Sequence, residues 1–105
     1  GSEFNISHNI EKAYSKKDIV YAKSWGCLSS YGQPEIQMAS NNTHKNFIVD
    51  SHKMSLTKSG VFSHCLPLRR NIKATDEVMD SDYCLAIKEA ANRKHVQKSL
   101  LTKIL

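Results

Sequence analysis

Basic and polar side chains follow three short segments of the chain, and they are the residues best suited to bind a small anion. The three groups are Lys23-Ser24-Trp25, Cys65-Leu66-Pro67 with Arg69, and Asn92-Arg93. In an open parallel sheet, ligands bind outside the carboxyl ends of the strands. If these groups lie at such ends, the chemistry they predict is the binding of a carboxylate or a phosphate.

Arg93 is the basic residue whose surroundings the pattern describes best. It lies three and seven residues before Val96 and Leu100, on the face that a terminal helix would bury. A buried guanidinium needs an anionic or hydrogen-bonding partner, and a helix N-terminus already favours anions. The pattern supports two partners equally: a bound phosphate or carboxylate, and an internal carboxylate such as Glu89 or Asp76.

The cysteines and histidines form neither a metal-binding nor a nucleophilic pattern. Cys27, Cys65 and Cys84 include no close pair, which argues against a disulfide framework and for a reducing compartment, so we expect a cytoplasmic protein. No Cys-x-x-Cys or His-x-x-x-His spacing occurs, so we expect no metal. His64 and Cys65 are neighbours that diverge on a strand, which excludes a Cys–His dyad and favours a buried, unreactive thiol at Cys65.

Pro67 follows the second predicted strand directly, and it has two interpretations. A cis Leu66-Pro67 peptide would turn backbone carbonyl groups toward a ligand. A proline that only ends the strand is the commoner case, and the pattern alone favours it.

The elements that position these groups alternate between helix and strand. Apolar periodicity predicts helices over 6–17, 51–57 and 92–105, strands over 18–22, 61–66 and 84–87, a brief extended piece at 47–49, and a long polar loop over 24–46. This alternation predicts an α/β fold, with a parallel sheet covered by helices on both faces in three layers. Three strands make a thin sheet, so we expect exposed edges or edges paired with strands outside this sequence.

Composition limits the class of protein. The chain has 105 residues, of which 40% are apolar, enough for one small domain. Its net charge of +5 comes from scattered basic residues, which favours an ordinary solvated surface over a nucleic-acid site. No apolar run approaches the roughly 20 residues that span a membrane. Residues 1–4, Gly-Ser-Glu-Phe, are typical of a vector-encoded linker, and we expect them to lie outside the fold.

Three segments, in the same order, resemble the aspartate/ornithine carbamoyltransferases. Residues 62–71 resemble the family's His-Cys-Leu-Pro segment, residues 18–25 the strand and loop before it, and residues 92–98 the Glu-Asn-Arg-x-His-x-Gln signature of the last helix. The resemblance covers essentially everything after residue 5, and the ordered trio is far more specific than one motif. It implies that residues 5–105 are a C-terminal part of the ornithine-binding domain, and thus a partial three-layer α/β sheet.

Within the family the chain is most similar to the N-acylornithine branch, which acts on acetylornithine or succinylornithine. Lys23 stands where ornithine enzymes carry an aspartate suited to the substrate's α-ammonium group. Acylation removes that positive charge and leaves a carboxylate, for which a lysine is suited. The Ser-Met-Gly loop of the ornithine branch is replaced by residues 28–32, and residues 69–76 again resemble the acylornithine branch.

The resemblance implies substrate-binding roles for two basic residues and a modification at a third. Lys23 would contact the carboxylate of the acylated ornithine, and Arg69 would reach its acyl or carboxylate end. Lys73 matches a lysine that can be carboxylated in the acetylornithine enzymes, although an ordinary exposed lysine is the commoner case and the one we expect here.

The resemblance also implies the residues at the reacting atoms. The carbonyl groups of Cys65 and Leu66 would accept from the carbamoyl NH2 group, with Leu66-Pro67 cis. The Cys65 side chain would lie beside the attacking δ-amine and polarise it without covalent chemistry. Arg93 would hold carbamoyl phosphate and stabilise negative charge on the transferred group. The reaction gives N-acylcitrulline and phosphate, as in arginine biosynthesis, and needs no cofactor.

Two departures from the family pattern limit what we expect of this chain. Ala91 replaces the glutamate that precedes Asn92 in the signature, and the Ser-x-Arg-Thr and His-Pro-x-Gln motifs are absent from the sequence. Family members are roughly three times as long, bind carbamoyl phosphate through a preceding domain, and are typically homotrimers. We therefore expect the 105-residue chain to be inactive alone. Two alternatives remain: a basic α/β binding module without catalysis, and a degenerate paralogue that keeps the fold but not turnover.

Overall fold

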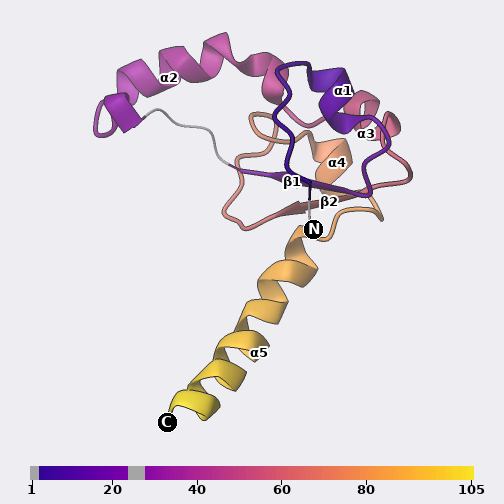
Figure 1. The fold of residues 1–105 in the computed structure, drawn as a ribbon. Coiled ribbons are helices and arrows are strands. Elements are labelled where there is room, and N and C mark those ends of the chain that lie inside the picture. Colours follow the sequence, from indigo (N-terminus) through magenta and orange to yellow (C-terminus); the bar gives the residue numbers. More distant parts are fainter. Residues whose placement is uncertain (1–2, 24–27) are drawn as a thin grey trace.

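Two short parallel strands lie at the centre of the fold in the computed structural model, which describes residues 3–23 and 28–105 (Figure 1). Strand β1 (Ile19–Ala22) pairs with β2 (Val61–His64) in a register that places Ile19 opposite Val61 and Ala22 opposite His64. Three of the four β2 residues are buried, as expected for a parallel strand with both faces covered. Both strands had been predicted from their apolar runs, and the α/β class is confirmed.

The predicted third strand is wrong beyond one residue. Cys84 forms a single parallel bridge with Phe62, whose carbonyl accepts from Leu85 N at 2.7 Å. Helix α5 then begins at Ala86, so Ile87, which the pattern placed in a strand, is a helical residue and 66% exposed. A short apolar run does not distinguish a buried strand from the first turn of a helix, which explains the error.

Three helices form at the predicted places with other bounds, and two further helices were not predicted. The structure has α1 (Ile10–Tyr14), α2 (Pro34–Thr43), α3 (Ser51–Ser55), α4 (Asp76–Met79) and α5 (Ala86–Ile104), with 3-10 turns at Leu28–Ser30 and Lys45–Phe47. Helix α2 lies where we predicted a loop. It buries no residue and is mostly polar, so the sequence contains no apolar stripe that would predict it. Pro34, a residue that is generally typical of loops, lies in its first turn, where proline is tolerated.

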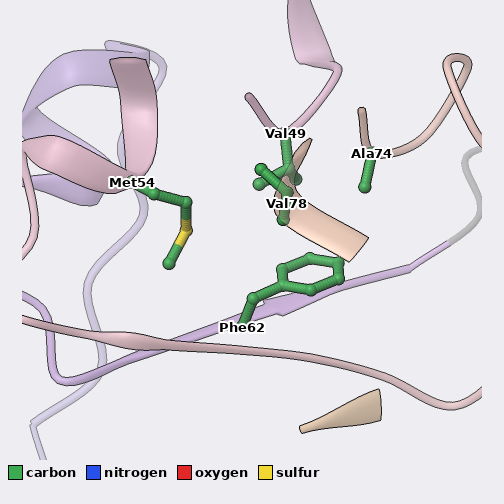
Figure 2. Packing of buried hydrophobic residues seen from close by; sticks show 5 residues of the cluster. All are labelled: Val49, Met54, Phe62, Ala74 and Val78. Carbon is green, nitrogen blue, oxygen red and sulfur yellow. The ribbon is translucent and has the colours of Figure 1, made fainter. Parts of the chain in front are cut away.

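The core lies between β2 and the short helices. Val49, Met54, Ala74 and Val78 pack around the ring of Phe62, which is fully buried (Figure 2). Helices α1, α3 and α4 lie on one side of the sheet, and α5 leaves from the other (Figure 1). The sheet therefore has a helix-covered face that carries the core and a second face on which the start of α5 packs against β2.

Helix α5 projects from the body as a single rod (Figure 1). It begins at Ala86 rather than at the predicted Asn92, and all residues from 91 onward are exposed. Val96 and Leu100, predicted to face a core, are 57% and 53% exposed. Among the described residues, none of the helices combines the length and apolarity that a membrane crossing needs.

Candidate functional site

A hydrogen-bonded cluster joins the two strands to α5 near their carboxyl ends. The Tyr21 hydroxyl donates to Glu89 Oε1 at 3.1 Å, and the buried Ser63 hydroxyl donates to Glu89 Oε2. Tyr21 also contacts the side chain of Cys65. We call these four residues, Tyr21, Ser63, Cys65 and Glu89, the Glu89 cluster. The sequence had suggested Glu89 only as an ion-pair partner of Arg93, and Tyr21 and Ser63 not at all.

The cluster keeps the Tyr21 phenol protonated. Loss of hydration around its hydroxyl, together with the hydrogen bond to the Glu89 carboxylate, raises the pKa of Tyr21 to about 12. A tyrosine of ordinary pKa is already protonated at neutral pH, so the raised pKa means that the cluster further favours the neutral phenol as a donor to Glu89.

The segment after β2 has the backbone geometry that the resemblance implied. The Leu66-Pro67 peptide is cis, so the interpretation of Pro67 as a plain strand-ending residue is wrong. Leu66 has φ of 47°, in the left-handed region, and its N–H donates to His64 Nδ1 at 2.9 Å. Cys65 is a free thiol that is half-buried rather than fully buried, and it directly follows the last residue of β2.

Arg93 is exposed and lies one helical turn beyond Glu89. Residues four apart share a face of a helix, so the guanidinium stands on the same face of α5 as the carboxylate that binds the strand ends. The predicted internal partners are occupied: Glu89 by Tyr21 and Ser63, and Asp76 by Arg70 at 2.9 Å. Arg93 forms no ion pair with any described residue, and it lies two turns inside α5 rather than at a helix N-terminus.

Lys23 directly follows β1 and is exposed, at the same edge of the sheet as Cys65 and Leu66. Its charge reaches His64: burial lowers the pKa of this imidazole, Glu89 opposes the shift, and Lys23 adds to it. Ser24 and Trp25, which the sequence grouped with Lys23, and Cys27 lie outside the described residues.

Lys73 and Arg69 form a second basic group. Lys73 is 4% exposed, so the alternative of an ordinary exposed lysine is wrong: its aliphatic stem is buried by the fold, and Nζ donates to Asn41 Oδ1 of α2 at 3.2 Å. Burial, and next the charge of Arg69, lower the pKa of Lys73. The exposed Arg69 lines a cavity of about 380 Å³ between α2 and residues 69–72.

This cavity combines apolar and polar walls. Its lining includes Met38, Ile48 and Ile72 on the apolar side, and Asn41, Asn42 and Lys45 on the polar side. It can therefore receive a ligand that has both an apolar part and a negative charge. In the part of the chain that the structure describes, no three His, Cys, Asp or Glu residues gather as metal ligands would.

Comparison with known proteins identifies relatives across the whole chain. The family model of the aspartate/ornithine carbamoyltransferase Asp/Orn binding domain matches residues 1–104. N-acetylornithine carbamoyltransferase of Xanthomonas campestris pv. campestris is 53% identical over 105 residues, which are 100% of this chain and 31% of that protein. N-succinylornithine carbamoyltransferase of Bacteroides fragilis is 34% identical over 100 residues, 95% of this chain and 30% of that protein.

Solved structures agree with these relatives. N-acetyl-L-ornithine transcarbamylase has a TM-score of 0.85 at 56% identity, over 94% of this chain and 30% of that one. The acetylornithine transcarbamylase complexed with acetylcitrulline has a TM-score of 0.84 at 55% identity, over 93% of this chain and 29% of that one. The chain thus spans about a third of the length of the relatives it matches. The resemblance seen in the sequence is confirmed, and the chain belongs to the aspartate/ornithine carbamoyltransferase family.

Proposed function

We propose that the chain is a fragment of an N-acylornithine carbamoyltransferase. The whole protein transfers the carbamoyl group of carbamoyl phosphate to the δ-amine of an N-acylornithine, giving N-acylcitrulline and phosphate in arginine biosynthesis. The observation that carries this proposal is the grouping at one sheet edge. Cys65 and the cis Leu66-Pro67 peptide follow β2, and α5 carries Arg93, exposed and without an ion pair to any described residue, on the helix face that holds Glu89.

The proposed chemistry is positioning and electrostatic stabilisation. The carbonyl groups of Cys65 and Leu66 accept from the carbamoyl NH2 group and orient the electrophilic carbon. The neutral δ-amine attacks this carbon beside the Cys65 thiol. Arg93 holds the phosphate and stabilises the negative charge that develops on the leaving group and the transferred oxygen.

Acylated rather than free ornithine is the substrate class that the basic residues favour. Lys23 is an exposed cation at the sheet edge, where it suits the substrate's carboxylate and would repel a free α-ammonium group. Arg69 and its cavity, with apolar and cationic walls, suit the acyl end. Relatives named for succinylornithine and for ornithine are each 34% identical, and the relative named for acetylornithine is 53% identical, which supports an N-acylornithine as the substrate.

Lys73 is the proposed modification site. A lysine reacts with carbon dioxide through its neutral amine, forming an N–C bond and releasing a proton. Burial lowers the pKa of Lys73 and so increases the neutral fraction. The resulting carbamate would place a carboxylate near Arg69 and Asn41. Equilibration with 13C-bicarbonate tests this, because the carbamate carbon signal should appear in the full-length protein and be absent from Lys73→Arg.

The functional test uses the full-length parent, which we propose to be a cytoplasmic homotrimer. We expect it to form acylcitrulline from carbamoyl phosphate and N-acetylornithine or N-succinylornithine, and the 105-residue chain to form none. Lys23→Ala and Arg93→Ala should abolish most of the activity, whereas Lys103→Ala, exposed at the far end of α5, should not.

Three results would contradict the proposal. Turnover by the isolated chain would show that it is not the incomplete part of a larger site. A full-length protein that binds N-acylornithine without turnover would be the degenerate paralogue. Binding to nucleic acid that weakens steeply with salt would instead favour the basic binding module.

A further inference from the structure

His64 is a buried polar residue that the proposed mechanism does not use. It ends β2, is 1% exposed, and lies between Ser63 of the Glu89 cluster and the Cys65-Leu66 segment. Among the described residues its ring makes one hydrogen bond, in which Nδ1 accepts from Leu66 N–H at 2.9 Å.

This hydrogen bond fixes the protonation of the ring. A ring nitrogen that accepts carries no proton, so the neutral imidazole holds its proton on Nε2. Burial favours the neutral form, because it lowers the pKa of His64. Nε2 is itself buried and has no hydrogen-bond partner among the described residues. An apolar ring in this place would avoid that unsatisfied donor, so packing alone does not account for a histidine here.

Leu66 is the residue that the contact constrains. Its φ of 47° lies in the left-handed region, which disfavours side chains with a Cβ. A hydrogen bond from the N–H of residue i+2 to a side chain at residue i is the geometry by which asparagine and aspartate stabilise tight turns. His64 makes the same contact to Leu66 through Nδ1, and so holds the peptide that precedes the Leu66 side chain in this unfavourable conformation.

We propose that His64 is a positioning residue for the transfer reaction. Through Nδ1 it orients the Cys65–Leu66 peptide group, so that the Cys65 carbonyl group points at the carbamoyl NH2 group. This inference rests on the proposed function, in which that carbonyl is a substrate contact. His64 does not touch the substrate or move a proton; it sets the direction of a dipole that a preorganised site needs in place before the reaction.

A pair of substitutions in the full-length enzyme separates orientation from packing. Asparagine places an acceptor close to the position of Nδ1, whereas glutamine places its polar group near Nε2 and leaves Leu66 N–H without an acceptor. Since a misplacement of about 1 Å can cost on the order of 100-fold in rate, we expect His64→Gln to lower kcat about 100-fold. His64→Asn should restore kcat to within about tenfold of the wild type, a fraction of that loss. The KM for N-acetylornithine should stay within about twofold in both, because Lys23 and Arg69 are untouched.

His52→Gln, an exposed histidine on α3, is the matched control and should behave as wild type. Equal losses in His64→Asn and His64→Gln, or a raised KM with unchanged kcat, would overturn the inference. An inactive wild-type enzyme would overturn both the inference and the proposed function. An active wild type with an equally active His64→Gln would overturn the inference alone.

A measurement on the unsubstituted protein covers the case in which the variants fail to fold. Ring 15N shifts of His64 should show the tautomer protonated on Nε2, and the Leu66 amide should exchange slowly with solvent. A ring protonated on Nδ1, or an unprotected Leu66 amide, would contradict the proposed contact directly.

Discussion

Replacing Glu89 tests whether one carboxylate fastens α5 to the strand ends. Its two oxygens accept from Tyr21 on β1 and Ser63 on β2, and the rest of α5 beyond residue 90 is exposed. Glu89→Ala leaves the buried Ser63 hydroxyl, 8% exposed, without its acceptor. Tyr21, which is more than half exposed, regains contact with water.

The expected loss of stability follows from the Ser63 contact. A hydrogen bond to a charged group contributes about 1.5–3 kcal/mol, and we assign this range to Glu89→Ala. A chain of this size has a free energy of unfolding of roughly 5–15 kcal/mol, so the loss is a large fraction. With a urea m-value of about 2 kcal/mol/M, the midpoint should fall by about 1 M. Lys88 is an exposed neighbour on α5, and Lys88→Ala should change the free energy of unfolding by no more than about 0.5 kcal/mol.

Titration of the tyrosines gives an independent readout. The chain has four tyrosines, and Tyr21→Phe identifies the one that titrates at about 12. Glu89→Gln removes the negative charge but keeps an acceptor, so the pKa of Tyr21 should fall toward its ordinary value near 10. If the ultraviolet titration of Glu89→Gln matches that of the wild type, and Glu89→Ala keeps the wild-type urea midpoint, then Glu89 does not fasten α5 and our reasoning is wrong.

Three further predictions concern the stability of the isolated chain. Amides of residues 93–104 should exchange within the dead time of a hydrogen-exchange experiment, because short unpacked helices are marginal in water; protection there would show that α5 has a partner. Phe62→Ala, at a fully buried position, should cost about 3–5 kcal/mol in urea unfolding, and a loss below 1 kcal/mol would contradict the core assignment. Hydrogen bonds from Arg70 lower the pKa of Asp80 in the folded protein, so the ionised carboxylate stabilises the fold. This contribution is fully present above the unfolded pKa of about 3.9 and is lost as the pH falls through the folded pKa. Arg70→Met should flatten the acid limb of the stability curve, and an unchanged limb would refute this.

The sequence predicts the sheet better than it predicts the helices. The runs at residues 18–22 and 61–66 are apolar and β-branched, bounded by polar residues, and both became strands. The polar segment at 34–43 became a helix without burying a residue, so its stability comes from contacts that no periodicity records. The start of α5 did leave a signal, because alanine, lysine and glutamate in residues 86–91 are strong helix formers. The apolar run at residues 84–87 predicted a strand instead, so the start of the helix was placed too late.

The sequence likewise predicts some residues of the candidate site and misses others. Sequence reasoning selected Lys23, Arg69 and Arg93 from their charge, and the structure places each of them exposed. It missed Ser63 and Tyr21 because their role depends on a carboxylate from a segment 26 residues away from one and 68 from the other. Contacts of this range exist only once the sheet and α5 are assembled. The cis geometry of Leu66-Pro67 came from the family resemblance, since the local pattern favoured the opposite choice.

The true start of α5 changes the physical reason for expecting an anion at Arg93. At a helix N-terminus the backbone dipole would share in the binding, but that effect is confined to the first turn, and Arg93 lies beyond it. The guanidinium must therefore bind the anion without help from the helix dipole, and the strength of that binding depends on where α5 places the guanidinium. Glu89 supplies that placement, one turn earlier on the same face and bound to both strands. It follows that Glu89→Gln in the full-length enzyme should weaken carbamoyl phosphate binding, although residue 89 does not itself contact the ligand. Combined with Arg93→Ala, it should cause little additional loss, because both substitutions remove the same positioned charge.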